Sequence, residues 1–343
     1  MGGSSSRHRN KAPVPEPMEI DAAGSAMSLL PHADTPDAYR ALRPDSSTWL
    51  PALAMLADRH GLGAEHFVRV TEGTNVVFAS DDLVLKLFPP HWAHLATAER
   101  AVLKRLRGRL PVQTPSVHAD GSLERWSYLI MNRLRGKELH TVWPTLGQDE
   151  KTRLVGDLGE LVAAVHNVPS ADLPALDADW PTYVSSRLQG CVSRHREQGL
   201  ASSWLHQIPA LLGAANPLYP PDYAQVIVTG DIHDYHLMVE QPTAGIGWRL
   251  CGLFDFDDAR LGFREFDLAA AGLFLMSGQP VLLRTFLLAY GYSSAELNST
   301  LSRRLLAYTL LHPYREMNWV LRTLVQGNPS TLDDLASTIY RMS

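Results

Sequence analysis

Two stretches of this chain place acidic side chains close behind apolar runs. Asp231 lies in VTGDIHDYHLMVE, and Asp255 follows about two dozen residues later in GLFDFDDARLGFREFDLAA. A phosphoryl-transfer site needs one carboxylate that accepts or orients a hydroxyl proton and a second acid that holds a metal ion on the phosphates. Residues 225–229 and 248–256 predict strands, and a hairpin of these strands would bring the two aspartates face to face.

The first stretch is also compatible with a different metal chemistry. Asp231, His233 and His236 form an Asp-x-His-x-x-His pattern. Imidazole and carboxylate ligands together suit zinc and other transition metals. A zinc hydrolase is therefore an alternative, although no second ligand cluster in the sequence supports it.

The segments before these stretches change character along the chain. Residues 35–60 have helical spacing interrupted near Pro44, whereas residues 67–71, 75–79 and 83–88 are β-like runs joined by tight turns. Such runs predict a small antiparallel sheet. Gly73, between the first two runs, would let the backbone approach a phosphate or serve simply as a turn residue.

One lysine of this predicted sheet is expected to face inward. Lys86 shares a strand face with Val84 and Phe88 because side chains alternate along a strand. The following segment, residues 96–110, has apolar residues at helical spacing and carries Glu99 at the margin of the apolar face. Glu99 could therefore reach Lys86.

The remainder of the chain is predicted to be mainly helical. Residues 126–131 form one more β-like run, followed by a connector up to about residue 137. Helices are expected over 150–168, within 183–212 and, roughly four or five of them, over 264–340. This order predicts an α+β architecture in which a β-rich half and a larger helical half meet at a cleft.

The two aspartate stretches resemble the catalytic loop and metal motif of the aminoglycoside phosphotransferase family. The usual family forms are His-Gly-Asp-x-His-x-x-Asn, Ile-Asp-Phe/Trp-x-Asp-Ala and Tyr-Asp-Leu-Ala, and the likeness runs from about residue 37 to 340. It implies a two-lobed protein-kinase-like fold, with a small antiparallel β N-lobe over 28–133 and a larger helical C-lobe over 134–343. Residues 1–27 are expected to be a disordered tail or an added extension.

The resemblance also implies roles around the metal. Asp231 matches the catalytic base, Asp255 the principal metal ligand, and Asp267 an acid that braces the catalytic loop. Two positions depart from the family pattern, since Thr229 replaces its loop histidine and His236 replaces its metal-binding asparagine. Magnesium prefers oxygen ligands whereas imidazole suits transition metals, so we expect Mg²⁺ or Mn²⁺ held by Asp255 with His236.

The nucleotide site follows from the same resemblance. Lys86 matches the lysine that grips the α- and β-phosphates of ATP or GTP, and Glu99 matches its helix partner. The stretch SYLIMNRLRGKEL is similar to the family hinge. The backbone at Met131, Asn132 and Arg133 is therefore expected to bind the adenine.

Within the family, DAYRALRPDSSTW, VLKLFPPHW and LLAYTLLHPY are similar to stretches of hygromycin B 7″-O-phosphotransferases. The resemblance implies an aminoglycoside substrate, hygromycin B in particular, whose ammonium groups carboxylates could bind. Acids expected in or near the cleft are Asp234, Asp257, Asp258, Glu265 and Glu316, and Trp319 could stack on a sugar ring. Two alternatives stay open: a kinase of another small alcohol, such as choline, homoserine or a different antibiotic, and a nucleotide-binding pseudokinase.

The composition bears on the kinds of partner and the cellular compartment that can be expected for this protein. The 31 basic and 36 acidic residues leave no basic excess for a nucleic-acid partner, and no run approaches the roughly 20 apolar residues that span a bilayer. The start of the chain has no signal-peptide core, and Cys191 and Cys251 are expected to be buried free thiols of a reducing compartment. We therefore expect a cytoplasmic monomer that acts on a small molecule.

Overall fold

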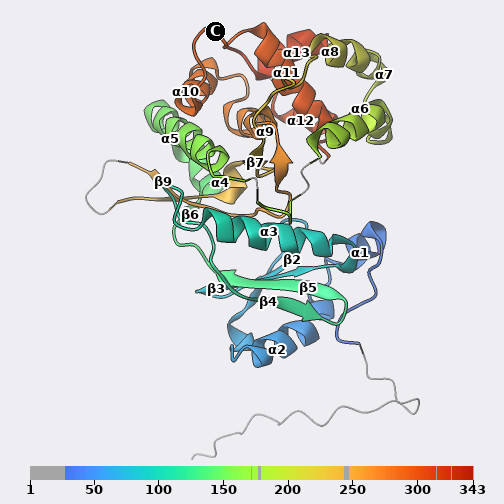
Figure 1. Ribbon diagram of the computed structural model, residues 1–343, viewed down its shortest axis with the longest axis vertical. Coiled ribbons are helices and arrows are strands. Elements are labelled where there is room, and N and C mark those ends of the chain that lie inside the picture. The colour runs from blue at the N-terminus through green and yellow to red at the C-terminus, as the bar shows by residue number, and fades with distance from the viewer. Residues whose placement is uncertain are drawn as a thin grey trace, which may run out of the picture.

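The computed structural model describes residues 28–170, 172–176, 179–242, 247–313, 315–325 and 327–342. A small N-lobe built around one sheet and a larger helical C-lobe are stacked along the long axis of the molecule (Figure 1). This is the two-lobed α+β fold that the sequence predicted. The expectation for residues 1–27 lies outside the described residues.

Short helices precede the N-lobe sheet. They are α1 (Pro36–Leu42), η1 (Ser46–Trp49), α2 (Leu50–Arg59) and η2 (Ala64–His66). α1 begins where the Thr35 hydroxyl accepts a hydrogen bond from the Ala38 N–H, because a capping side chain satisfies a donor that the helix leaves unpaired. The interruption predicted near Pro44 lies between α1 and η1.

The N-lobe sheet has five antiparallel strands in the order β1-β2-β3-β5-β4. Their bounds are β1 Val68–Val70, β2 Val76–Ala79, β3 Leu83–Phe88, β4 Val117–Leu123 and β5 Trp126–Asn132. The strands predicted over 67–88 and 126–131 are confirmed, whereas β4 was not predicted. β4 is an edge strand with mostly exposed or half-buried residues, and therefore carries little hydrophobic alternation.

The two faces of this sheet belong to different layers. Leu85 and Leu87 of β3 pack in the core on the side of α2, whereas Phe88 packs in the core on the side of α3 (Ala93–Leu106). Lys86 shares the face of Phe88 and is only 5% exposed. The inward orientation predicted for this lysine is confirmed. The alternation thus places an ammonium group where the sheet meets Asp255 and Asp257 of the C-lobe.

α3, which follows η3 (Pro90–Trp92), ends at Leu106 and not at Leu110 as the periodicity predicted. Gly108 has φ +68°, a left-handed conformation that commonly terminates helices and that glycine adopts without steric cost. Glu99 remains in the helix and is 2% exposed. The shorter helix therefore still presents it to the sheet.

The C-lobe is mainly helical, as predicted. Its helices are α4 (Leu139–Val142), η4 (Trp143–Thr145), α5 (Gln148–His166), α6 (Trp180–Glu197), α7 (Ser202–Leu205), α8 (Ile208–Ala214), α9 (Glu265–Met276), α10 (Pro280–Tyr290), α11 (Ser299–Leu311), α12 (Met317–Thr323) and α13 (Leu332–Ile339). α5 packs against α10, and α9 packs against α11. Over the described ranges, none of the helices has the length and apolar character needed to cross a membrane.

The predicted hairpin between residues 225–229 and 248–256 is wrong. β7 (Val226–Val228) pairs with β10 (Arg260–Gly262), whereas β9 (Arg249–Leu253) pairs with β8 (Leu237–Glu240), which also pairs with β6 (Lys137–Glu138). The error arises because β8 follows the single turn η5 (Asp234–His236) so closely that it reads as part of the loop. Asp231 and Asp255 are brought together by the β8–β9 hairpin and the loop that precedes it.

Candidate active site

The loop after β7 is held through its backbone. Asp267, in the first turn of α9, accepts hydrogen bonds from the Thr229 N–H at 2.8 Å and the Gly230 N–H at 3.0 Å. Nε2 of His166 lies 3.1 Å from the same carboxylate. Asp267 is fully buried, so these contacts replace the water that its charge would otherwise require. The geometry agrees with the bracing role implied by the resemblance.

Gly230 permits a sharp turn just before Asp231. Its φ is +90°, and a Cβ there would lie 2.8 Å from both Cβ and the carbonyl oxygen of Asp258. Burial lowers the pKa of His312 to about 3, so the ring is neutral and its Nε2 donates to the Gly230 carbonyl at 2.8 Å. The loop is thus fixed from two sides at the residue that precedes the candidate base.

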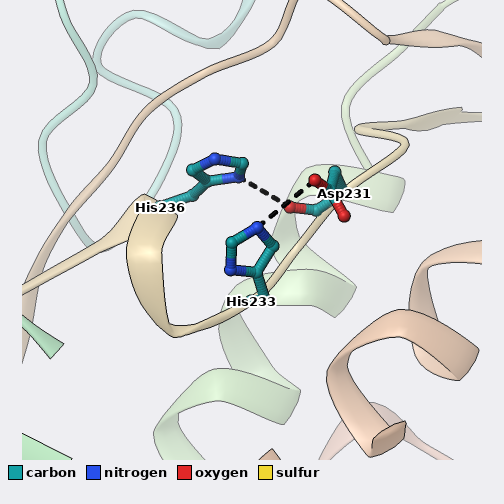
Figure 2. Close-up of side chains that lie close together, drawn as sticks. All are labelled: Asp231, His233 and His236. Atoms are coloured by element: carbon teal, nitrogen blue, oxygen red, sulfur yellow. Dashed lines mark hydrogen bonds and ion pairs between the residues drawn. The ribbon is translucent and has the colours of Figure 1, made fainter. Parts of the chain in front are cut away.

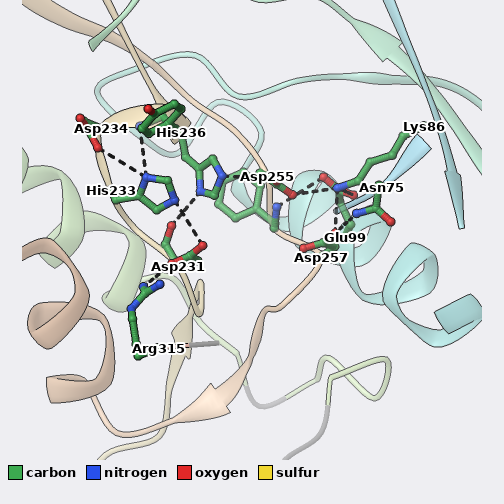
Figure 3. Close-up of polar contacts among 12 residues, drawn as sticks. Asn75, Lys86, Glu99, Asp231, His233, Asp234, His236, Asp255, Asp257 and Arg315 are labelled. Carbon is green, nitrogen blue, oxygen red and sulfur yellow. Dashed lines mark hydrogen bonds and ion pairs between the residues drawn. The ribbon is translucent and has the colours of Figure 1, made fainter. Parts of the chain in front are cut away.

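The carboxylate of Asp231 lies between two basic side chains. Its Oδ2 is 3.2 Å from Nε2 of His233, and its Oδ1 accepts a hydrogen bond from Nη2 of Arg315 (Figure 3). Burial favours the neutral acid, but the His233 hydrogen bond and the Arg315 guanidinium outweigh it and hold the pKa of Asp231 well below its usual range. Asp231 is therefore ionised and suited to accepting and orienting a hydroxyl proton.

His233 keeps a proton on the nitrogen that faces Asp231. Burial lowers the pKa of His233, but its hydrogen bonds to Asp231 and Asp234 outweigh burial and raise this pKa to about 9. A neutral ring would keep the same proton, because Nδ1 would then accept the Tyr235 N–H at 3.2 Å. In either form Nε2 is a hydrogen-bond donor and not a metal ligand.

In His236 the hydrogen bond toward Asp231 is made by Nδ1 and not by Nε2. Its Nδ1 lies 2.7 Å from the backbone carbonyl oxygen of Asp231, and since a carbonyl only accepts, Nδ1 must carry the proton. Its Nε2 lies 3.4 Å from Oδ2 of Asp255. Histidine metal ligands usually donate their other ring N–H to a carbonyl or carboxylate in this way. His236 and Asp255 therefore fit a divalent ion through one nitrogen and one oxygen.

The same tautomers weigh against the zinc hydrolase alternative. Asp231, His233 and His236 do come together, with potential ligand atoms within 4.8 Å of one another (Figure 2). However, the His233 and His236 nitrogens that face Asp231 both donate hydrogen bonds to it. This cluster is a hydrogen-bond network around the candidate base, not a set of lone pairs aimed at one zinc ion.

Lys86 meets three carboxylates where the lobes face each other. Its Nζ lies 2.9 Å from Oε2 of Glu99, 2.8 Å from Oδ1 of Asp255 and 3.0 Å from Oδ2 of Asp257 (Figure 3). The contact predicted between Lys86 and Glu99 is present. One ammonium group faces three acids, so the cluster carries excess negative charge that a further cation would neutralise.

The charges of this cluster are unequal. Burial and the nearby Asp255 and Asp257 raise the pKa of Glu99 to about 7, although Lys86 lowers it. Burial also opposes the ionisation of Asp255, but Lys86 and His236 outweigh it and lower the pKa of Asp255 to about 2. Asp255 is thus the strongly ionised acid, as a principal metal ligand should be.

The backbone of Asp255 is held in an uncommon conformation. Its φ is +68°, which is unfavourable for a residue other than glycine and is found most often at functional sites. The neighbouring amides fix it, since the Phe254 N–H donates to the His236 carbonyl at 3.1 Å and the Phe256 N–H to Oε1 of Glu99 at 3.4 Å. The turn directs the Asp255 carboxylate between Lys86 and His236 (Figure 3).

The turn between β1 and β2 closes over this cluster. Asn75 is 5% exposed and its Nδ2 donates to Oδ2 of Asp257 at 2.6 Å. Behind it, the Tyr39 hydroxyl donates to the Thr74 carbonyl at 2.8 Å, and Arg43 donates to the Gly73 carbonyl. The turn is therefore attached both to the first helices and to the C-lobe.

The predicted hinge lies at the end of β5. Met131 is buried and paired with both β3 and β4. The Asn132 N–H donates to the Ser116 carbonyl at 3.1 Å, and the Arg133 N–H donates to the Asp82 carbonyl at 2.7 Å. The Asn132 and Arg133 N–H groups, which were expected to bind adenine, therefore already donate to protein carbonyls.

The acids expected to bind substrate do not form one surface. Asp257 is engaged by Lys86 and Asn75, and Oδ1 of Asp234 lies 3.5 Å from Nδ1 of His233. Burial, with Asp257 and Asp231 nearby, raises the pKa of Asp258 to about 7. Glu316 is exposed at the start of α12.

Of two further residues expected near the substrate, one lies in the core and the other on the surface. Glu265 is buried and accepts hydrogen bonds from Arg304 and Tyr292, which makes it part of the C-lobe core. Trp319 is 38% exposed, with its ring 5.9 Å from that of Phe274. Phe274 in turn lies 5.2 Å from the His233 ring, so two residues, Phe274 and His233, lie between Trp319 and the candidate base Asp231.

Sequence reasoning missed Arg315 and Asn75. Arg315 reaches Asp231 across 84 positions of sequence, and Asn75 reaches Asp257 across 182. Neither residue belongs to a local motif or a periodic pattern. The only signal was that Arg315 follows the LLAYTLLHPY stretch and that Asn75 follows the turn containing Gly73.

The model of the APH phosphotransferase enzyme family matches residues 57–304, which is more than half of the chain. The chain belongs to this family. The match includes both aspartate motifs, Lys86 and the whole N-lobe sheet. No curated protein matches the chain.

Solved APH-family structures have the same fold. Aminoglycoside 2′-phosphotransferase-IIIa, solved as its GDP complex, gives a TM-score of 0.64 at 17% identity and covers 85% of this chain and 98% of that chain. The aminoglycoside phosphotransferase APH(3″)-Id from Streptomyces rimosus gives 0.57 at 18% identity, with 77% and 98% covered. The macrolide 2′-phosphotransferase MphH from Brachybacterium faecium gives 0.51 at 20% identity, with 77% and 99% covered.

Proposed function

We propose that this APH-family phosphotransferase moves the γ-phosphoryl group of ATP or GTP to a hydroxyl of an aminoglycoside, with hygromycin B as the preferred substrate. The observation that carries the proposal is the continuous series of contacts from Lys86 through Asp255 and His236 to Asp231. It supports the proposal because one site would then hold a cation for the phosphates, a pair of metal ligands and a carboxylate that orients the hydroxyl.

Each residue has a defined task in this proposal. Asp231 accepts the hydrogen bond of the acceptor hydroxyl and orients its oxygen toward the γ-phosphorus. Lys86, fixed by Glu99, binds the α- and β-phosphates, and Asp255 with His236 would hold a divalent ion, Mg²⁺ or Mn²⁺. Such an ion supplies charge neutralisation for the phosphates. Catalysis would come from positioning and electrostatics, without a covalent intermediate on the protein.

Support for the substrate is the likeness of three stretches to hygromycin B kinases, together with aminoglycoside phosphotransferases among the similar structures. Because a macrolide phosphotransferase has the same fold, the class of acceptor molecule has to be determined by experiment. The acceptor panel should therefore hold hygromycin B, other aminoglycosides, a macrolide, choline and homoserine.

The test is nucleoside-diphosphate release from ATP and from GTP, with Mg²⁺ and with Mn²⁺, across that panel. We expect hygromycin B to stimulate this release. Asp231→Asn and Asp255→Asn should each lower the stimulated rate by orders of magnitude. The matched control is Asp149→Asn, since Asp149 is exposed on α5. Release that no acceptor stimulates would rule out the proposed reaction.

A nucleotide-binding protein without turnover is the second candidate, and one observation favours it. Thr229 stands where the family has a loop histidine, and its buried hydroxyl oxygen has no hydrogen-bond partner among the residues that the structure describes. Thermal shift with ATP and each ion, beside the release assay, separates the two candidates. Binding with no turnover for any acceptor would favour the second.

A further inference from the structure

We propose that Arg315 is a positioning residue that acts through Asp231, orienting its carboxylate toward the acceptor hydroxyl. The inference rests on the proposed function, because it assigns a partner to the base of that reaction. Arg315 lies between α11 and α12, outside the aspartate motifs.

The first support is the way one connection holds the candidate base. His312 and Arg315 both lie in the segment between α11 and α12, and they reach successive residues of the catalytic loop. His312 donates to the Gly230 carbonyl at 2.8 Å, and Arg315 donates to the carboxylate of Asp231. The same connection therefore fixes the backbone before the base and the side chain of the base itself.

The second support is that Arg315 is itself immobilised. It is 8% exposed, and its guanidinium carbon lies 4.4 Å from the centre of the Phe274 ring. Phe274 also contacts His233, at 5.2 Å between ring centres. Arg315, Phe274, His233 and Asp231 thus form a closed ring of contacts, which leaves the carboxylate little rotational freedom.

The experiment compares Arg315→Met and Arg315→Lys with Arg322→Met, since Arg322 is exposed on α12. Arg315→Met should lower kcat up to about a hundredfold, as misplacement of a reacting group does, with little change in KM for the nucleotide. Arg315→Lys should recover part of kcat, because its ammonium group can still donate a hydrogen bond to the carboxylate.

A second measurement needs no turnover. Crystal structures of the Arg315→Met and Arg322→Met variants compare the position of the Asp231 side chain directly. Its carboxylate should move from its place beside His233 in Arg315→Met and keep that place in Arg322→Met.

These two measurements separate the possible failures. If no acceptor supports turnover, the proposed function fails but the crystal structures still test the positioning. An unmoved Asp231 carboxylate in Arg315→Met would overturn the inference. So would a loss of kcat that follows the melting temperature equally in Arg315→Met and Arg315→Lys, because that would be structural support alone.

Discussion

Nε2 of His236 lies 3.4 Å from Oδ2 of Asp255, while Nδ1 of the same ring is fixed 2.7 Å from the carbonyl oxygen of Asp231. The imidazole therefore links the backbone of the candidate base to the candidate metal ligand. Its Nε2 and the carboxylate oxygen of Asp255 face each other (Figure 3). An asparagine would offer only oxygen as a ligand atom there, so in the proposed reaction the choice of ion would depend on this residue.

The first prediction concerns that choice. Wild-type protein with ADP should bind Mn²⁺ more tightly than Mg²⁺, and His236→Asn should lose about 10–100-fold in Mn²⁺ affinity, as loss of a group that shapes a metal site typically does. Titration followed by Mn²⁺ EPR gives the affinities. Pulsed EPR should show coupling to an imidazole ¹⁴N in wild type and none in His236→Asn. Absence of nitrogen coupling in the wild type would remove His236 from the site.

The second prediction concerns Lys86. Lys86→Met leaves Glu99, Asp255 and Asp257 facing one another without their ammonium partner, which should cost about 3–5 kcal/mol of unfolding free energy near pH 8. The three acids can take up protons, so the loss should be smaller near pH 5. Urea denaturation at both pH values measures this, with the exposed Lys104→Met on α3 as the control. An equal loss at both pH values would contradict the charge argument.

The third prediction contrasts a buried acid with an exposed one. Asp267→Asn weakens the charge-assisted bonds to the Thr229 and Gly230 amides, and it should cost about 2–4 kcal/mol and lower kcat as well. Asp333→Asn removes a surface ion pair with Arg303, of 2.6 Å, in which the Asp333 side chain is 59% exposed, and it should cost less than about 1 kcal/mol. Similar losses in the two variants would show that the loop does not depend on Asp267.

The fourth prediction concerns pH in the absence of metal. The pKa values of Glu99 and Asp258 are raised to about 7 by burial and neighbouring carboxylates, above their ordinary values of 4.5 and 3.8. These two acids then bind more protons in the folded protein than in the unfolded chain, so their contribution to stability should be full below about pH 4 and fall as pH rises through 7.

Asp258→Asn should flatten this dependence by up to about 4 kcal/mol, the equivalent of its pKa shift. Unfolding free energies from urea titrations at pH 5 and pH 8 provide the comparison, with Asp149→Asn as the control. Added Mn²⁺ should also flatten the slope in wild type, because a bound cation favours the ionised acids. A wild-type stability that rises from pH 5 to pH 8 would contradict the prediction.

Local patterns were sufficient to predict much of this molecule. Alternation in VLKLF placed Lys86 inward, helical spacing placed Glu99 on the face of α3 that meets the sheet, and the run of helices after residue 264 is present. The pairing of β7 with β10 was out of reach, since Arg260–Gly262 is a three-residue strand with no hydrophobic alternation. Strand partners depend on the whole fold, whereas strand faces depend on the local period of two.

The residues of the candidate site differ in the same way, because some lie in local motifs and others meet only through the fold. Asp231 and Asp255 could be named because each lies in a motif with ordered neighbours. Arg315 could not, because its guanidinium meets Asp231 only through the packing of α9, α11 and α12. The protonation of His236 was equally out of reach, since it follows from a backbone carbonyl whose position the sequence does not reveal.

The bond from Asn75 to Asp257 has a consequence for how a nucleotide enters. The β1–β2 turn and the metal motif belong to opposite lobes, yet this 2.6 Å contact joins them beside Lys86. In the proposed reaction the phosphates bind that lysine, so entry of the nucleotide would depend on whether the turn between β1 and β2 moves away from Asp257. A protein with Asn75→Ala would then take up ATP faster and release it faster too.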